Sequence, residues 1–258
     1  YEPVINLQGA NAVHCRLEAP EFRIDWDEVK EKISAKTSTI LINTPHNPTG
    51  MVMTDEDMKN LEAIAVDHDL LVISDEVYNH LVFDGIEHKS PLQYPELAKR
   101  SISIYSFGKT FHATGWKIGY AIAPPAITAE IRKIHQFVTF TTHTPGQFAL
   151  ADFMSDPSTY SYLPSFFQKK RNLFFDGISG SRFSGTPSKG TYFPLLSFEK
   201  ISQEGDEEMA NRLTKEFKLA TIPISVFYEG GYDASYLRLC FAKEDETLLK
   251  AAKIMCQL

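Results

Sequence analysis

Two nearly continuous apolar runs, separated by an amphipathic stretch, place the strongest constraint on the fold. The runs are TILINTP at residues 39–45 and LLVISDEVY at residues 70–78. Continuous rather than alternating hydrophobicity is typical of parallel strands that are buried on both faces. Between the runs, Thr54 and Asp57 have the spacing of a capping box, and apolar residues then recur at helical intervals. Strand, helix and strand in this order predict a βαβ unit.

The pattern of strands and helices changes near residue 155. Before this point the sequence predicts further strands at 101–107 and 120–124 and helices at 95–100 and 127–140. After it, the sequence predicts a helix at 156–178, short strands at 190–198 and 236–242, and helices at 206–219 and 244–258. We therefore expect an α/β fold with an open, mostly parallel sheet in residues 1–155, and a smaller α+β C-terminal domain in residues 156–258.

Composition narrows the class of protein. The net charge of −7 argues against nucleic acid or an anionic membrane as the main partner. No apolar run approaches the length of a membrane span. The three cysteines have no metal-ligand spacing, and their odd number favours a reduced, cytoplasmic setting. We expect no metal site.

Polar side chains gather where the predicted strands end. Asn47 follows the first strand, Asp75 and Tyr78 end the second, and Ser106 and Lys109 follow the third. Each has an ordinary explanation when taken alone, such as a turn at HNPTG, a helix cap or a solvated lysine. In an open α/β sheet, however, ligands bind outside the carboxyl ends of the strands. Together, these residues indicate a ligand site.

The residue types match the needs of pyridoxal phosphate. A carboxylate such as Asp75 keeps a pyridine nitrogen protonated, and a partly desolvated lysine such as Lys109 forms a Schiff base. Asn and Tyr side chains can hydrogen-bond a phenolate oxygen on the same ring. Ser106 and Lys117 can hold a phosphate through a hydroxyl group and a point charge.

Four segments in order resemble the class I/II group of fold-type I pyridoxal-phosphate aminotransferases. They are NTPHNPTG (43–50), ISDEVYNHLVF (73–83), SFGKTFHATGWKIGY (106–120) and YLRLCFAK (236–243). The amino-acid sequences of these segments are similar to those of the methionine, kynurenine and glutamine-type branch of the aminotransferases. The resemblance runs through nearly the whole chain.

The resemblance implies a role for each site residue. Lys109 would bind the cofactor covalently and then move a proton as general base and acid. Asp75 would pair with the pyridinium nitrogen, while Asn47 and Tyr78 would bind the 3-oxygen of the ring. The phosphate would be bound by Ser106 and Lys117. Arg238 would clamp the substrate α-carboxylate, a task that suits the arginine fork.

The chain departs from the family pattern in two ways. Many relatives have Arg at the position of Lys117, so we expect a weaker phosphate contact without the bidentate fork. The family also has an N-terminal portion that supplies part of the phosphate site, a ring-stacking aromatic residue and a tyrosine lent across the dimer. We therefore expect an N-terminally truncated chain that alone binds cofactor poorly and turns over little. The family implies a homodimer.

The lead hypothesis is an aminotransferase that moves an amino group from an apolar or aromatic, methionine-like amino acid to a 2-oxo acid. The alternative on the same scaffold is a carbon–sulfur β-lyase, which would release pyruvate and a thiol without an oxo-acid acceptor. A cofactor-sensing domain without catalysis is a third reading, although the acidic charge argues against an associated DNA-binding role. His46 and His112 have no evident catalytic partner, so we expect local packing or turn hydrogen bonds for both.

Overall fold

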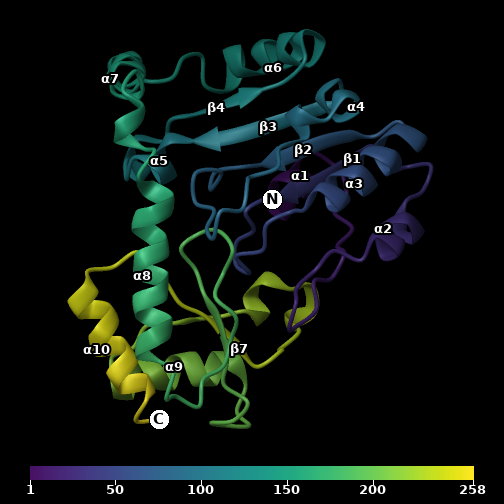
Figure 1. Ribbon diagram of the computed structural model, residues 1–258. Coiled ribbons are helices and arrows are strands. Elements are labelled where there is room, and N and C mark those ends of the chain that lie inside the picture. Colours follow the sequence, from purple (N-terminus) through teal and green to yellow (C-terminus); the bar gives the residue numbers. More distant parts are fainter.

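The computed structural model describes residues 1–258 and contains two β-sheets joined by a long helix (Figure 1). The larger sheet has the strand order β1-β2-β3-β4. The strands are β1 (Thr39–Asn43), β2 (Leu71–Asp75), β3 (Ser101–Ser106) and β4 (Gly119–Ile122). The first three are parallel, and β4 runs antiparallel to β3. The predicted open, mostly parallel sheet is confirmed.

Helix α3 (Asp55–Asp67) supplies the predicted crossover between β1 and β2. Its capping box is formed: Thr54 Oγ1 accepts from the Asp57 amide at 3.1 Å, and Asp57 Oδ2 accepts from the Thr54 amide at 2.8 Å. The helix buries one face against the sheet and α4 (Pro95–Ala98). The cluster comprises Ile42, Met53, Met58, Leu61, Ala65, Val72 and Leu97. This apolar face fixes α3 on the sheet.

The remaining helices of the first part are α1 (Glu2–Leu7), α2 (Trp26–Lys32), α5 (Phe107–Thr110), α6 (Pro125–Val138) and α7 (Thr144–Met154). Four of these helices, α1, α2, α5 and α7, are absent from the elements predicted from the sequence. Helices α1 and α2 are only 6 and 7 residues long, which is too short for a helical period of apolar residues to be recognised in the sequence. Helix α7 opens with Thr-Pro-Gly, which is typical of a turn, yet Pro145 is accommodated in the first helical turn.

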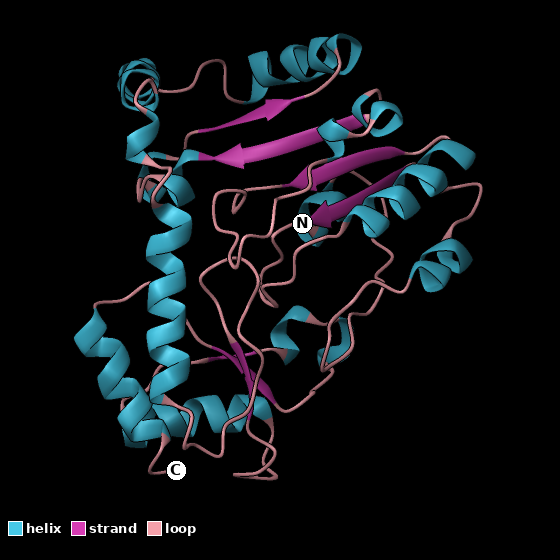
Figure 2. Ribbon diagram, in the orientation of Figure 1, coloured by secondary structure: helices cyan, strands magenta, loops and turns pink.

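The smaller sheet contains β5 (Leu195–Ser197), β6 (Ile222–Pro223) and β7 (Tyr236–Arg238) in the order β5-β7-β6, all antiparallel. Helices α8 (Leu163–Gly177), α9 (Asp206–Phe217) and α10 (Asp245–Met255) surround it (Figures 1 and 2). Five 3₁₀ turns complete the chain: η1 (Pro91–Gln93), η2 (Thr114–Trp116), η3 (Pro157–Thr159), η4 (Ser225–Phe227) and η5 (Glu229–Gly231).

Several predicted bounds in this second part were wrong. The strands at 190–198 and 236–242 are reduced to three residues each. Hydrogen bonds continue from the Leu239 amide to the Pro194 carbonyl, but Pro194 has no N–H to return one. The helix predicted from residue 156 begins at Leu163, because η3 occupies the earlier segment. Pro164 lies in the first helical turn, where proline is tolerated because its missing N–H would have no intrahelical partner.

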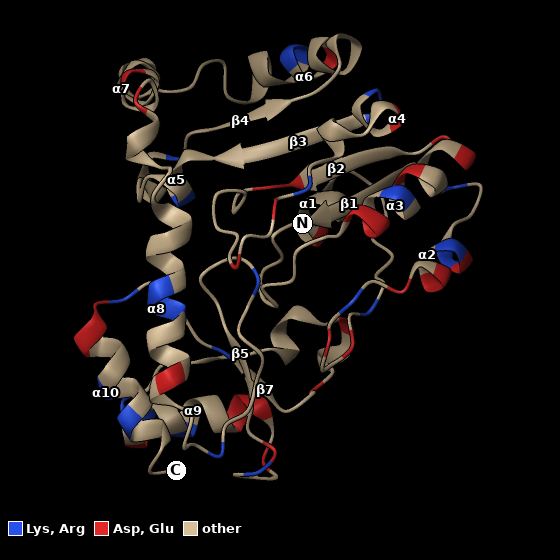
Figure 3. Cartoon of the chain, in the orientation of Figure 1, with Lys and Arg blue, Asp and Glu red and all other residues tan.

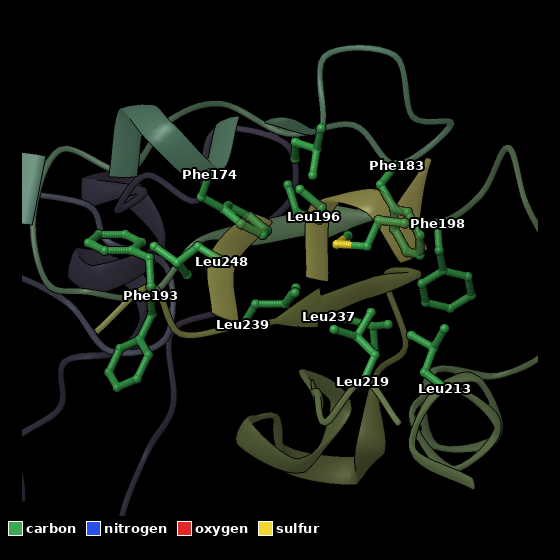
Figure 4. Packing of buried hydrophobic residues seen from close by; sticks show 14 of the residues in the cluster. Phe174, Phe183, Phe193, Leu196, Phe198, Leu213, Leu219, Leu237, Leu239 and Leu248 are labelled. Atoms are coloured by element: carbon green, nitrogen blue, oxygen red, sulfur yellow. The ribbon is translucent and has the colours of Figure 1, made fainter. Parts of the chain in front are cut away.

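The largest buried cluster has 21 residues and fills the space around the smaller sheet (Figure 4). It includes Leu237 of β7, Phe174 of α8 and Leu213 of α9. Tyr78, Leu81 and Phe83, which follow β2, belong to the same cluster. The segment after β2 therefore packs against the C-terminal part of the chain. The division into domains at 155/156 stays a prediction.

No helix of the chain combines the length and hydrophobicity needed to cross a bilayer. No group of three or more His, Cys, Asp or Glu side chains is placed to hold a metal ion.

Candidate active site

The carboxyl edge of the larger sheet brings the ends of β1 and β2 together. Asn43 pairs with Asp75, and Asp75 pairs with Ile104 of β3. Asn43 Nδ2 donates to the Asp75 carbonyl at 2.9 Å, and Asn43 Oδ1 accepts from the Asn47 amide at 2.8 Å. Asn43 was not predicted as a site residue. It connects two residues that were, and its place at the end of an apolar strand was the available signal.

Asp75 is the one charged residue within the four strands of this sheet (Figure 3). Its Oδ1 accepts from the Val77 amide at 3.2 Å, and its Oδ2 accepts a hydrogen bond from the Tyr1 hydroxyl. Tyr1 as a residue is exposed, but desolvation of its hydroxyl and the neighbouring Asp75 carboxylate raise the pKa of that hydroxyl above its ordinary range. Tyr1 therefore stays a proton donor to Asp75. Nothing in the sequence pattern pointed to this contact.

Arg238 and Asn47 meet between the two sheets. Arg238 ends β7 and donates from Nη1 to Asn47 Oδ1 at 2.7 Å. Its guanidinium carbon lies 4.2 Å from the ring centroid of Phe193 and 5.3 Å from that of Phe227. Burial lowers the pKa of Arg238, yet a guanidinium remains protonated in proteins. The result is a half-buried cation held between aromatic rings.

The turn that carries Asn47 is fixed from both sides. Gly50 has φ of +70°, and a Cβ at this position would lie 2.4 Å from the Ser188 Cβ. Only glycine fits both the left-handed conformation and the close approach of the segment that carries Ser188. His46 Nδ1 lies 2.8 Å from Thr49 Oγ1, which is the turn hydrogen bond expected for this histidine.

Tyr78 and Lys109 face one another. The Lys109 ammonium lies 5.6 Å from the centroid of the Tyr78 ring. Tyr78 is buried, and Tyr192 and Phe193 contact it edge-on at centroid distances of 5.4 and 6.0 Å. Burial, with a smaller contribution from Tyr192, raises the pKa of Tyr78, and Arg238 opposes this rise. The hydroxyl is therefore protonated at neutral pH.

Ser106 ends β3 and pairs with Gly119 of β4. Between them the chain folds tightly, because a Cβ on Gly108 would lie 2.9 Å from the Thr114 Cα. Lys117 is exposed in the left-handed conformation with φ of 56°, and it makes no hydrogen bond or ion pair with the other six predicted residues. The structure thus brings Asn47 to Arg238 and Lys109 to Tyr78, and it leaves Lys117 facing solvent near Ser106.

A cavity of about 300 Å³ opens beside Ser106. Tyr105, His80 and Tyr160 are among its walls. Burial lowers the pKa of His80, with a further contribution from His88, so His80 is neutral in this wall at neutral pH.

The larger sheet carries ligand-type residues at its carboxyl edge, and the smaller α+β part supplies an arginine to the same place. This arrangement defines the class of protein: an α/β enzyme of the aminotransferase type. The family model "Aminotransferase class I and II" matches residues 1–254, and the chain belongs to this family.

The relatives agree with this assignment. The chain is 42% identical to a methionine aminotransferase of Escherichia coli (strain K12), covering 100% of this chain and 67% of that protein. It is 32% identical to a human kynurenine–oxoglutarate transaminase 3, covering 99% of this chain and 63% of the relative. A solved Escherichia coli structure described as having a methionine aminotransferase function matches with a TM-score of 0.97 at 42% identity, covering 100% of this chain and 68% of the other. The N-succinyldiaminopimelate aminotransferase of Mycobacterium tuberculosis matches with a TM-score of 0.93 at 31% identity, covering 99% and 67%. The chain therefore spans about two thirds of the length of the relatives it matches.

Members of this family use pyridoxal phosphate, and the residues present fit that group. The donor set contains a carboxylate at the sheet edge, a lysine against a buried tyrosine, and a serine beside a cavity. A Cβ on Gly108 would collide with the Thr114 Cα, so glycine is needed for the tight turn that follows Ser106. These are the residue types that hold a pyridinium, an aldehyde and a phosphate.

Proposed function

We propose that this chain carries catalytic residues of an aminotransferase that moves the amino group of a methionine-like amino acid to a 2-oxo acid. The observation that carries the proposal is the contact between Arg238 and Asn47, which lies next to the edge that holds Asp75. A half-buried guanidinium at a ligand edge suits a substrate carboxylate. The 42% identity to the Escherichia coli methionine aminotransferase supports the reaction and the substrate class.

Pyridoxal phosphate supplies an electron-accepting ring that stabilises negative charge at the substrate Cα. Asp75 would keep the pyridine nitrogen protonated once its Oδ2 is released from the Tyr1 hydroxyl, and Asn43 holds the backbone of Asp75 in place. The side chains of Tyr78 and Asn47 would donate to the 3-oxygen of the ring. Tyr78 is buried, and the backbone N–H of Asn47 is held by Asn43 Oδ1. Ser106 and Lys117 would bind the phosphate.

Lys109 would bind the cofactor covalently and move the proton at the substrate Cα. The Tyr78 ring lies beside its ammonium group and shields one side of it from water. General-base catalysis by a lysine uses its neutral amine to remove the proton. We therefore assign Lys109 the role of general base in the proposed reaction.

Arg238 would orient the substrate carboxylate. Its charge is half-buried between Phe193 and Phe227, so the surroundings of the carboxylate are largely apolar. Aromatic walls favour an apolar or thioether side chain over a charged one. This agrees with a methionine-like donor.

Two further parts of the proposal concern assembly and location. A homodimer is typical of the family. A cytoplasmic location would agree with the three free cysteines. Size-exclusion chromatography with light scattering tests the first, and fractionation of the source cells tests the second.

Borohydride trapping tests the central claim. The chain is incubated with millimolar pyridoxal phosphate, reduced and digested, and the modified lysine is located by mass spectrometry. Reduction captures even weak binding, so the readout does not need full activity. We expect the adduct on Lys109, and an adduct on another lysine would overturn the assignment. Two incubations then separate the reactions. Transfer of the amino group from methionine requires a 2-oxo acid acceptor, whereas release of pyruvate, ammonia and methanethiol from S-methylcysteine and water without an acceptor indicates a β-lyase.

A further inference from the structure

Glu76 is a fully buried carboxylate directly after Asp75. Successive residues of a strand point to opposite faces of the sheet, so Glu76 lies on the face opposite to Asp75. Its backbone amide continues the pairing with β3 by donating to the Ile104 carbonyl at 2.8 Å. Its side chain is 0% exposed. A buried carboxylate is costly unless several donors surround it.

Three donors from two other segments surround this carboxylate. Ser90 Oγ donates to Oε1 at 3.0 Å, and the Tyr105 hydroxyl donates to Oε2 at 3.1 Å. His88 Nε2 lies 2.7 Å from Oε2. A carboxylate accepts only, so Nε2 carries the shared proton. The carboxylate thus joins the end of β2, the segment before η1, and the end of β3.

The residues joined by this network flank the predicted cofactor contacts. Glu76 follows Asp75 and precedes Tyr78 by two residues, and Tyr105 precedes Ser106. The Tyr105 ring stacks on Tyr120 of β4 at 4.8 Å, which extends the connection to the next strand. A shift of the Glu76 carboxylate would therefore move the ends of β2 and β3 relative to one another.

We propose that Glu76, held by His88, Ser90 and Tyr105, is a positioning residue that sets Asp75 and Ser106 at the spacing the cofactor requires. The inference rests on the proposed function for the identity of that ligand. Stability alone does not call for a charge here, because an apolar side chain of similar volume stabilises a core at least as well as a buried charge does. Glu76 touches none of the reacting atoms and acts through its neighbours.

Hydrogen exchange tests the positioning without any cofactor. Glu76→Gln keeps the shape but replaces one acceptor oxygen by a donor, so the donors around it lose a partner. We expect the backbone amides of residues 76 and 77 to exchange about ten-fold faster or more, since a hydrogen bond to a charged group is worth at least that factor. Amides of α3 should not change. The matched control is Glu87→Gln, an exposed carboxylate in the same segment. Unchanged exchange at 76 and 77, or an equal rise in α3, would overturn the proposal.

A double-mutant cycle on pyridoxal phosphate affinity tests whether the effect passes through Asp75. We expect Glu76→Gln to weaken binding at least about five-fold in the native chain and to have little effect in the Asp75→Asn background. An equal loss in both backgrounds would show a general structural role and refute the coupling. If the native chain forms no Lys109 adduct at all, the proposed function fails, while the exchange result still decides the positioning role. If Glu76→Gln does not fold, Tyr105→Phe removes a single donor, keeps the ring, and is measured in the same way.

Discussion

The guanidinium of Arg238 donates to Oδ1 of Asn47 at 2.7 Å, although 191 residues separate the two in the chain. Arg238 lies on the central strand of the smaller sheet, and Asn47 lies in the turn after β1 of the larger one. The candidate site therefore depends on how the two sheets are placed. The Gly50 turn against Ser188 and the bridge between Val82 and Gly190 hold the same junction.

Arg238→Lys should weaken binding of the amino acid far more than binding of the cofactor. Lysine keeps the charge but loses the fork and the planar contact with Phe193. We expect the methionine concentration at half-saturation to rise about ten-fold or more, measured from the absorbance change of the cofactor-loaded chain. Arg182→Lys, at an exposed position, is the control. Equal half-saturation in both variants would exclude Arg238 as the carboxylate clamp.

Substitutions of Lys109 and Lys117, the two lysines of the segment 106–120, should have different effects in a borohydride-trapping experiment. Lys109→Met should abolish the borohydride-stable adduct, because no other lysine contacts the Tyr78 ring. Lys117→Met should leave the adduct at Lys109 and weaken cofactor affinity by only about three-fold, since its charge is exposed and screened. Lys99→Met is the control for a general loss of charge. A normal adduct in Lys109→Met would refute the assignment of the covalent lysine.

The sequence predicted the strand-end residues because two local patterns coincide there. Apolar runs fix where β1, β2 and β3 end, and the polar residues that follow must share one edge. Contacts that depend on tertiary placement gave no such pattern. Tyr1 reaches Asp75 across 74 residues, and His88 reaches Glu76 from an irregular segment. The shortened strands around Pro194 could not be predicted for a similar reason. The hydrophobic pattern does not show which backbone N–H groups find hydrogen-bond partners in the neighbouring strand.

Arg171 should be one of the most sensitive positions for stability. It is buried and makes a bidentate pair with Asp84 at 2.7 and 2.6 Å, and it also donates to the Ser188 carbonyl at 2.8 Å. Arg171→Met leaves that carbonyl and the carboxylate unpaired, so we expect a loss of about 3 kcal/mol in the free energy of unfolding. Urea unfolding at pH 7 measures it. Lys169→Met on the same helix should change the free energy of unfolding by less than about 0.5 kcal/mol. Equal effects would show that the Arg171 pair adds nothing.

Acid should weaken the ion pair between Asp84 and Arg171. Its hydrogen bonds to Arg171 lower the pKa of the Asp84 carboxyl below its ordinary value of 3.8. A lowered folded pKa means that the stabilisation is present above the unfolded pKa and is lost as pH falls through the folded value. We expect Asp84→Asn to be less stable than the native chain at pH 6, with the difference shrinking below pH 4. A difference that stays constant from pH 6 to pH 3 would contradict this.

His46 should make stability pH-dependent in a higher window. Burial lowers the pKa of His46 to about 4 from an ordinary value of 6.5. Between these values the unfolded chain binds a proton that the folded chain does not, so the free energy of unfolding falls as pH drops from 6.5 toward 4. The loss from this residue should reach about 3 kcal/mol at pH 4. His46→Gln should flatten the slope between pH 6.5 and 5, a range that lies above the titration of Asp84, while His80, whose pKa is also lowered, retains part of it. Substituting the exposed His68 by Gln should leave the slope unchanged. The argument fails if His46→Gln and His68→Gln give the same slope, because burial of the imidazole would then have no measurable consequence for folding.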